Sequence, residues 1–165
     1  MARKLDDLGL PRWLKPMNKV IVALQRRGLA IGTMRLLSVP GRNTGKLRTT
    51  PVSPLSVEDK RYIVAGLDGA DWVKNVRAAG WGILAKGWEE ERVGLVELPV
   101  EERGTILWHF PHKVPHGVQF FKRLYGVSGN SDEFAALARR CPVFEVTPLR
   151  EEDAGERERQ DPPAV

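Results

Sequence analysis

The feature that most constrains this sequence is a pair of short β-strand patterns on either side of a glycine-rich turn. Residues 33–40 (TMRLLSVP) and residues 47–57 (LRTTPVSPLSV) are rich in Thr, Val and Leu, and the polar segment GRNTGK separates them. Strand patterns joined by a short turn that contains glycine predict a β-hairpin. A hairpin pairs its strands antiparallel, so the sheet is expected to begin without a crossover helix.

The rest of the chain continues this pattern and adds helices. Further strands are predicted at 61–67, at 81–88 and 92–99 (a second hairpin around the charged turn 89–91), and at 141–149. Helices are predicted at 17–29, 71–80, 100–110, 117–126 and 131–140, the last with Ser131 as its N-cap. Because hairpins dominate and the strand–helix alternation of a Rossmann fold is missing, we expect an α+β fold: a small, mostly antiparallel barrel.

The positive charge is concentrated in the first third of the chain. The 165 residues carry a formal net charge of +5, but residues 1–50 hold 11 Lys and Arg against 2 Asp and Glu, which is a net of +9. Such a region suits an anionic partner: a nucleic acid, a membrane surface or a phosphorylated cofactor. The length fits one domain over residues 1–149, followed by a polar tail, 150–165, that we expect to be flexible.

Several classes of protein are disfavoured. A single cysteine excludes a disulfide framework, and no apolar run is long enough to span a membrane. The N-terminus lacks a signal-peptide core, which favours a cytoplasmic location. Residues 14–50 contain no aromatic side chain to interleave with the basic ones, which argues against nucleic acid. For the amphipathic segment 17–29, packing on a core is favoured over contact with a membrane surface.

The loop from Gly41 to Arg48 is the segment most informative about chemistry. Its two glycines let the backbone turn sharply and present N–H groups, and its side chains add three cations and a hydroxyl. The cations are Arg42, Lys46 and Arg48, and the hydroxyl belongs to Thr44. The loop fits either an anion cradle or a plain basic hairpin tip. It differs from a Walker A loop, because Leu47 replaces the residue that would hold magnesium.

Aromatic and histidine side chains offer weaker signals. Trp72 and Asn75 on one helix could cover a flat ring and bind its polar edge, although a core Trp is the simpler interpretation. Phe120 and Phe121 are expected in the core, with the wall of an aromatic substrate pocket as the alternative, whereas the hydroxyl of Tyr125 needs a partner. The histidines at 109, 112 and 116 are expected to be solvated or hydrogen-bonded rather than metal ligands, because Pro111 and Pro115 interrupt helical spacing. Cys141 is expected to be buried rather than nucleophilic.

Together these segments resemble the deazaflavin-dependent nitroreductase family. The resemblance is carried by LLSVPGRNTGKLRTTPV, RYIVAGL and DWVKNVRAAG, supported by FFKRLYGVS and CPVFEVTPL, and covers residues 17–149. It implies a split β-barrel with flanking helices that uses coenzyme F420, an 8-hydroxy-5-deazaflavin. The tail of this cofactor carries a phosphodiester and several glutamate carboxylates, which would suit the basic first third.

The resemblance also implies a set of cofactor-binding residues. In the family the hairpin holds the acidic tail, the strand before the helix lies against the deazaflavin ring, and a Trp-x-x-Asn helix follows. The hairpin pattern falls on Gly41, Arg42, Thr44, Gly45, Arg48 and Pro51, with Asn43 and Lys46 in the same loop; the ring segment is Ala65, Gly66 and Leu67, and the helix residues are Trp72 and Asn75. An Asp in segment 67–71, where some relatives have Lys, is a departure.

The function implied is an F420H2-dependent reductase that transfers a hydride to an activated alkene, a quinone or a nitroaromatic. Ser53 and Tyr125 are candidate proton donors, and the scarcity of tyrosines argues against nitroimidazole activation. The partner would be a small hydrophobic or aromatic acceptor, and the protein a monomer or homodimer without a metal. Alternatives are an FMN- or tetrapyrrole-binding split-barrel protein, although FMN has only one phosphate, or a non-catalytic lipid- or fatty-acid-binding relative.

Overall fold

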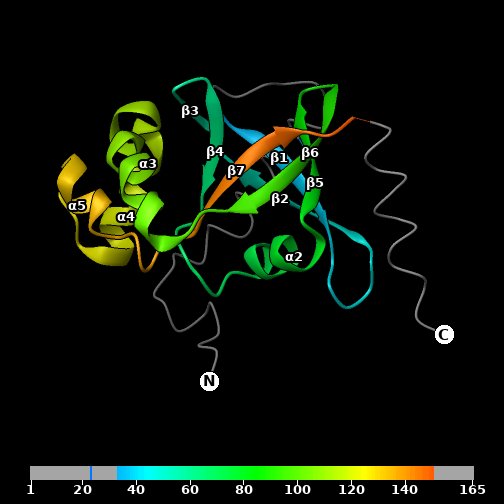
Figure 1. The fold of residues 1–165 in the computed structure, drawn as a ribbon, viewed down its shortest axis with the longest axis horizontal. Coiled ribbons are helices and arrows are strands. Elements are labelled where there is room, and N and C mark those ends of the chain that lie inside the picture. Colours follow the sequence, from blue (N-terminus) through cyan, green and yellow to red (C-terminus); the bar gives the residue numbers. More distant parts are fainter. Residues whose placement is uncertain (1–22, 24–32, 151–165) are drawn as a thin grey trace.

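The computed structural model describes residue 23 and residues 33–150, which build a curled antiparallel sheet with flanking helices (Figure 1). Its strands are β1 (Arg35–Pro40), β2 (Leu47–Val52), β3 (Leu55–Val57), β4 (Lys60–Val64), β5 (Trp81–Lys86), β6 (Glu89–Glu97) and β7 (Val143–Pro148). Its helices are α2 (Asp71–Ala79), α3 (Val100–Lys113), the 3-10 turn η2 (Pro115–Gly117), α4 (Val118–Tyr125) and α5 (Ser131–Ala135). The predicted α+β class is confirmed. The predicted helix 17–29 and tail lie outside the described residues, apart from residues 23 and 150.

The strand order brings the two ends of one predicted strand to opposite edges of the sheet. The order is β2-β1-β5-β6-β7-β4-β3, so β2 and β3 are the edges although only Ser53 and Pro54 separate them in sequence. The prediction of one strand over 47–57 was therefore wrong. Pro54 has no backbone N–H and cannot continue a ladder. The sheet must curl so that its edges approach each other, which makes it a split barrel.

The second hairpin turns two residues earlier than predicted. Gly87 and Trp88 form its tip, and Gly87 has a positive φ of 59°, which a two-residue hairpin turn requires. Glu90 and Glu91 lie in β6 opposite Ala85 and Leu84 rather than in a turn. The prediction of a charged turn at 89–91 was wrong. The turn needs a residue with positive φ, which Gly87 supplies, and this requirement outweighs the polar character of the glutamates.

Two helix boundaries also differ from expectation. Helix α3 continues through Pro111 to Lys113, since Phe110 and Pro111 are buried and their packing outweighs the one lost backbone hydrogen bond. Helix α5 begins after Asn130, not Ser131, because the Asn130 side chain accepts a hydrogen bond of 2.7 Å from the N–H of Asp132. It ends at residue 135, five residues before the predicted end.

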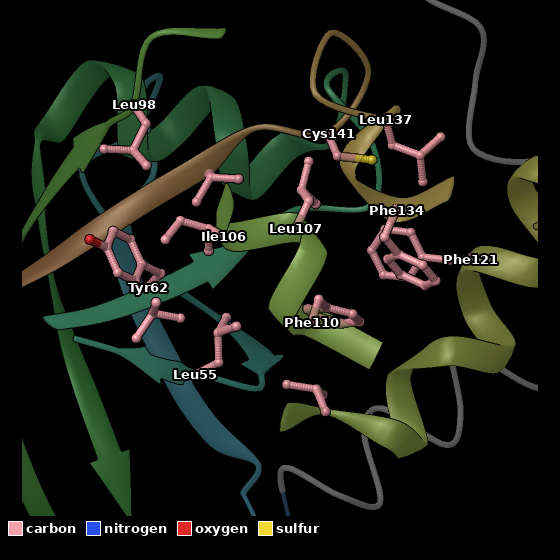
Figure 2. Packing of buried hydrophobic residues seen from close by; sticks show 13 residues of the cluster. Leu55, Tyr62, Leu98, Ile106, Leu107, Phe110, Phe121, Phe134, Leu137 and Cys141 are labelled. Carbon is pink, nitrogen blue, oxygen red and sulfur yellow. The ribbon is translucent and has the colours of Figure 1, made fainter. Parts of the chain in front are cut away.

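The hydrophobic side chains form two clusters on different sides of the sheet. Helices α3, α4 and α5 gather beside β3 and β4, whereas α2 packs against β1 (Figure 1). In the first cluster Phe110, Phe121 and Phe134 lie together with ring centroids 4.9 to 5.6 Å apart (Figure 2). Cys141 is fully buried in the same cluster, which confirms its predicted burial. The second cluster fills the curl of the sheet and anchors α2 through Val73.

Candidate functional site

A pocket of about 950 Å³ lies where the β1–β2 loop, the start of α2 and the α3–α4 region meet. Its loop end is polar and basic and includes Arg42, Thr44 and Arg48. Its other end has an apolar wall that includes Val114, Phe120 and Phe121, and the same α3–α4 region also contributes the polar side chains of His116, Gln119 and Arg123. A volume of this size accommodates a small organic molecule, and the two ends differ in the chemistry they offer.

The β1–β2 loop is a tight turn that its two glycines make possible. The Gly41 N–H donates to the Lys46 carbonyl and the Gly45 N–H donates to the Gly41 carbonyl, both at 2.8 Å. Gly45 has a φ of 71°, the left-handed region that favours glycine. Within the described part of the chain, the N–H groups of Asn43 and Thr44 have no acceptor. The loop therefore has backbone donors that no acceptor in the described residues uses, which is a requirement of the anion cradle considered for this sequence.

Asn75 fastens this loop to α2. Its Oδ1 atom accepts from the backbone N–H of Arg42 at 3.2 Å and from Nη1 of the same residue at 2.9 Å. Nη2 of Arg42 lies 3.1 Å from Oδ1 of Asp71 in the first turn of the helix. Asn75 is only 5% exposed, so its side-chain oxygen orients the loop.

The charges at the loop end do not cancel. The carboxylate of Asp71 is paired with Arg42, and that of Asp68 is paired with Arg77 at 2.7 Å. Across residue 23 and residues 33–150, by contrast, Arg48 and Lys46 have no carboxylate partner. The acidic departure from the family pattern is thus neutralised locally, and the net charge left at this end of the pocket is positive.

The peptide between Gly66 and Leu67 has a fixed orientation. The Gly66 carbonyl accepts a hydrogen bond from the Tyr125 hydroxyl and lies 3.9 Å from Sγ of Cys141. The peptide is trans, so the Leu67 N–H points away from these two residues. In the described segments this N–H has no acceptor, and both Gly66 and Leu67 line the pocket.

Burial keeps the partners of the Gly66 carbonyl protonated. Desolvation raises the pKa of the Tyr125 hydroxyl well above its ordinary value, and the neighbouring Cys141 raises it further. Burial also raises the pKa of the Cys141 thiol to about 11. At neutral pH both groups are donors, and Tyr125 lies behind the pocket wall rather than in it.

The ring of Phe120 lies directly on Gly66. A Cβ atom at Gly66 would overlap Cε1 of Phe120, which explains why this position has no side chain. Phe120 packs edge-to-face on Phe121, with ring centroids 5.8 Å apart. Phe120 was expected in the core, but it is half-buried and forms an aromatic wall of the pocket.

Ser53 and His116 meet on the pocket wall. Oγ of Ser53 lies 3.0 Å from Nε2 of His116, although the residues are 63 positions apart. Ser53 belongs to the link between β2 and β3, and His116 lies in η2 just before α4. The sequence interpretation expected solvated or hydrogen-bonded histidines rather than metal ligands, but it did not connect His116 with Ser53. No local pattern links two residues that only the tertiary fold brings together.

Most of the predicted site residues line this one pocket. They are Gly41, Arg42, Asn43, Thr44, Arg48, Pro51, Ser53, Gly66, Leu67, Trp72 and Asn75. Gly45 and Lys46 stay in the adjoining loop without lining the pocket, and Ala65 is buried with its N–H bound to the Pro142 carbonyl. Tyr125 does not line the pocket, but it contacts two residues that do, Gly66 by a hydrogen bond and Phe121 by its ring.

Two other kinds of site find no candidate in the described ranges. Among residues 33–150 no three His, Cys, Asp or Glu side chains are grouped so as to hold a metal ion. Likewise, none of the described helices has the length and hydropathy needed to cross a membrane.

The curled antiparallel sheet, its flanking helices and the pocket at its split define a split β-barrel protein. Residues 2–119 match the model of the F420H2-dependent quinone reductase family, and the chain belongs to that family. It is therefore an F420H2-dependent reductase with F420 as its cofactor, which confirms the resemblance recognised in the sequence. No curated protein matches the sequence.

Solved structures agree with this fold. A protein described as a domain-swapped dimer shares 20% identity with a TM-score of 0.52, covering 81% of this chain and 96% of its own. An F420-H2-dependent reductase shares 23% identity with a TM-score of 0.49, covering 69% and 93% of the two chains. A putative pyridoxamine 5'-phosphate oxidase from Listeria innocua shares 11% with a TM-score of 0.48, covering 81% and 94%. Only the first of these likenesses has a TM-score above 0.5, and at 20% identity it concerns the fold alone.

Proposed function

We propose that the pocket binds the acidic tail of F420 at its loop end and reduces a small aromatic or conjugated acceptor at its apolar end. The observation that carries this proposal is that one pocket holds both Arg48, a cation without a carboxylate partner in the described residues, and an aromatic wall. A quinone is the acceptor class that the family description names. Activated alkenes and nitroaromatics share its flat, electron-poor character.

The residues present fit the cofactor. Its phosphodiester and glutamate carboxylates need cations and N–H donors, which Arg48, Lys46 and the free N–H groups of the loop provide. The Leu67 N–H would face a polar edge of the deazaflavin ring, and Trp72 would lie beside the ring. When bound, reduced F420 supplies a hydride, and the chain supplies orientation and a wall that excludes water.

The apolar end favours a flat acceptor. Phe120, Phe121 and Val114 offer an aromatic and aliphatic surface on which a conjugated ring can stack. Ser53 and His116, together with Gln119 and Arg123, add polar groups that can bind a carbonyl or nitro oxygen. We assign Tyr125 to holding the Gly66 peptide, because its hydroxyl is already donated to that carbonyl.

Binding experiments test the proposal. The protein is titrated with F420 and separately with FMN, and tryptophan quenching is followed at several salt concentrations. We expect F420 to bind at micromolar concentration or tighter, and Arg48→Ala to weaken it about tenfold, the loss of roughly one charge-assisted contact. Lys86→Ala removes an exposed cation that does not line the pocket and should leave the affinity unchanged.

Turnover tests the choice of acceptor. Oxidation of F420H2 is followed with menadione, with a cyclohexenone and with a nitroaromatic. A preference for FMN, or equal losses in Arg48→Ala and Lys86→Ala, would contradict the assignment of the loop. Binding without oxidation by any of the three acceptors would contradict a reductase acting on these classes.

A further inference from the structure

The hydrogen bond between Ser53 and His116 has no evident structural purpose. His116 is exposed and Ser53 is half-buried, and the bond joins two side chains at the surface of the pocket. Such a bond adds little to folding stability. Both residues nevertheless line the pocket at the end where Phe120 and Val114 form its apolar wall.

Reduction of a quinone or an activated carbonyl needs a proton as well as a hydride. A hydride adds two electrons and one hydrogen, which leaves a negative oxygen on the acceptor. A hydroxyl or imidazolium held at that oxygen stabilises the charge and protonates it. The Tyr125 hydroxyl is donated to the Gly66 carbonyl, whereas the Ser53 hydroxyl is paired with an exposed histidine that can exchange protons with solvent.

We propose that Ser53 and His116 form a proton relay to the acceptor. The Oγ–H bond of Ser53 breaks as the new O–H bond of the product forms, and the imidazolium form of His116 passes its Nε2 proton to Oγ. The imidazole is left neutral and regains a proton from solvent, to which it is exposed. The hydride comes from F420H2, so the step rests on the proposed function. Ser53 is the catalytic residue, and His116 reprotonates and orients its hydroxyl.

The geometry supports this direction of transfer. When Nε2 of His116 carries a proton, it donates to Oγ of Ser53 across the 3.0 Å contact. The serine hydrogen is then free to point at a ligand rather than back at the ring. Histidine is the side chain suited to shuttle protons near neutral pH, and exposure lets it exchange them quickly.

Single-turnover kinetics test the relay. F420H2-loaded enzyme is mixed with saturating menadione, and the return of oxidised F420 absorbance is recorded. We expect Ser53→Ala and His116→Gln to slow this phase about 100-fold, the typical share of a positioned acid. The matched control is His112→Gln, an exposed histidine on α3 that does not line the pocket. Added imidazole should restore the rate of His116→Ala, which a merely structural role would not allow.

A second readout is independent of turnover. The ring protons of His116, identified by their loss in His116→Gln, are followed by NMR while 2-naphthol is added to enzyme that holds oxidised F420. We expect a shift that is reduced in Ser53→Ala. Wild-type rates in both relay variants, or no shift, would overturn the relay while leaving the reductase intact. An inactive wild-type enzyme would instead overturn the proposed function, and the relay with it.

Discussion

A single side-chain oxygen of Asn75 accepts two hydrogen bonds from Arg42, one from its backbone and one from its guanidinium. This relationship joins the anion-binding loop to the first turns of α2 across 33 positions of sequence. The loop is therefore oriented by the helix rather than by its own glycines alone. The two predicted motifs, the glycine-rich hairpin and the Trp-x-x-Asn helix, act as one unit.

Removing this anchor should loosen the loop. We expect Asn75→Ala to weaken F420 binding about tenfold and to lower the free energy of unfolding by about 1–2 kcal/mol, because two donors of Arg42 lose their acceptor. Tryptophan quenching and urea denaturation measure the two effects. Ala78→Gln, on the exposed side of the same helix, is the control. Equal behaviour of the two variants would rule out the anchor.

The contact between Gly66 and Phe120 predicts that substitutions at these two positions have non-additive effects on the free energy of unfolding. Gly66→Ala places a methyl group inside the Phe120 ring and should lower the free energy of unfolding by about 1–3 kcal/mol. In a Phe120→Ala background the same change should cost much less, since the ring is gone. Gly69→Ala, where an added Cβ meets nothing within 4 Å, is the matched control. Additive losses would show that the clash is relieved elsewhere.

Replacing Tyr125 should weaken F420 binding more than it slows proton transfer to the acceptor. Tyr125→Phe keeps the ring but removes the donor to the Gly66 carbonyl, so we expect about 1 kcal/mol of lost stability and weaker F420 binding. The absorption maximum of bound F420 should also shift, because the Leu67 N–H would lose its fixed direction. At saturating F420, the single-turnover rate should fall far less than in Ser53→Ala. A loss as large as that of Ser53→Ala would instead assign proton donation to Tyr125.

The carboxylate of Glu97 predicts a pH-dependent contribution to stability. It accepts from Arg77 at 2.6 and 2.8 Å and from Arg103 at 3.0 Å, and Arg103 is only 8% exposed. The hydrogen bonds from Arg77 lower the pKa of Glu97 below its ordinary 4.5, more than burial raises it. The stabilisation is therefore present above pH 4.5 and is lost as the pH falls through the lower folded-state pKa.

Glu97→Gln should accordingly lower the free energy of unfolding by about 1–3 kcal/mol at pH 7. The difference from wild type should shrink as the pH drops below 4.5. Urea denaturation at a series of pH values measures this trend. Glu90→Gln, an exposed glutamate on the same strand, should change stability by less than about 0.5 kcal/mol throughout. A difference for Glu97→Gln that does not change with pH would contradict the ion-pair explanation.

Sequence patterns predicted the parts of this site that are built from residues close together in the sequence. The Gly41–Arg48 loop and helix α2 appear as expected, because glycine placement and helical spacing are properties of neighbouring residues. The division of residues 47–57 into β2 and β3 at opposite edges of the sheet was missed, since the pairing of a strand depends on residues far away in the sequence. The pairing of Ser53 with His116 was missed for the same reason. Phe120 was assigned to the core because hydrophobicity alone cannot distinguish a core side chain from a pocket wall.

The link of Ser53 and Pro54 sets an upper limit on how wide the barrel can open. From Val52 to Leu55 the chain takes three Cα steps, which span at most about 10 Å when fully extended. The gap between the two sheet edges at this end can therefore hold little more than two strand spacings. Inserting a residue into the link of Ser53 and Pro54 would widen this gap and admit bulkier acceptors. Side-chain substitutions in the pocket wall cannot have this effect, because they leave the length of the link unchanged.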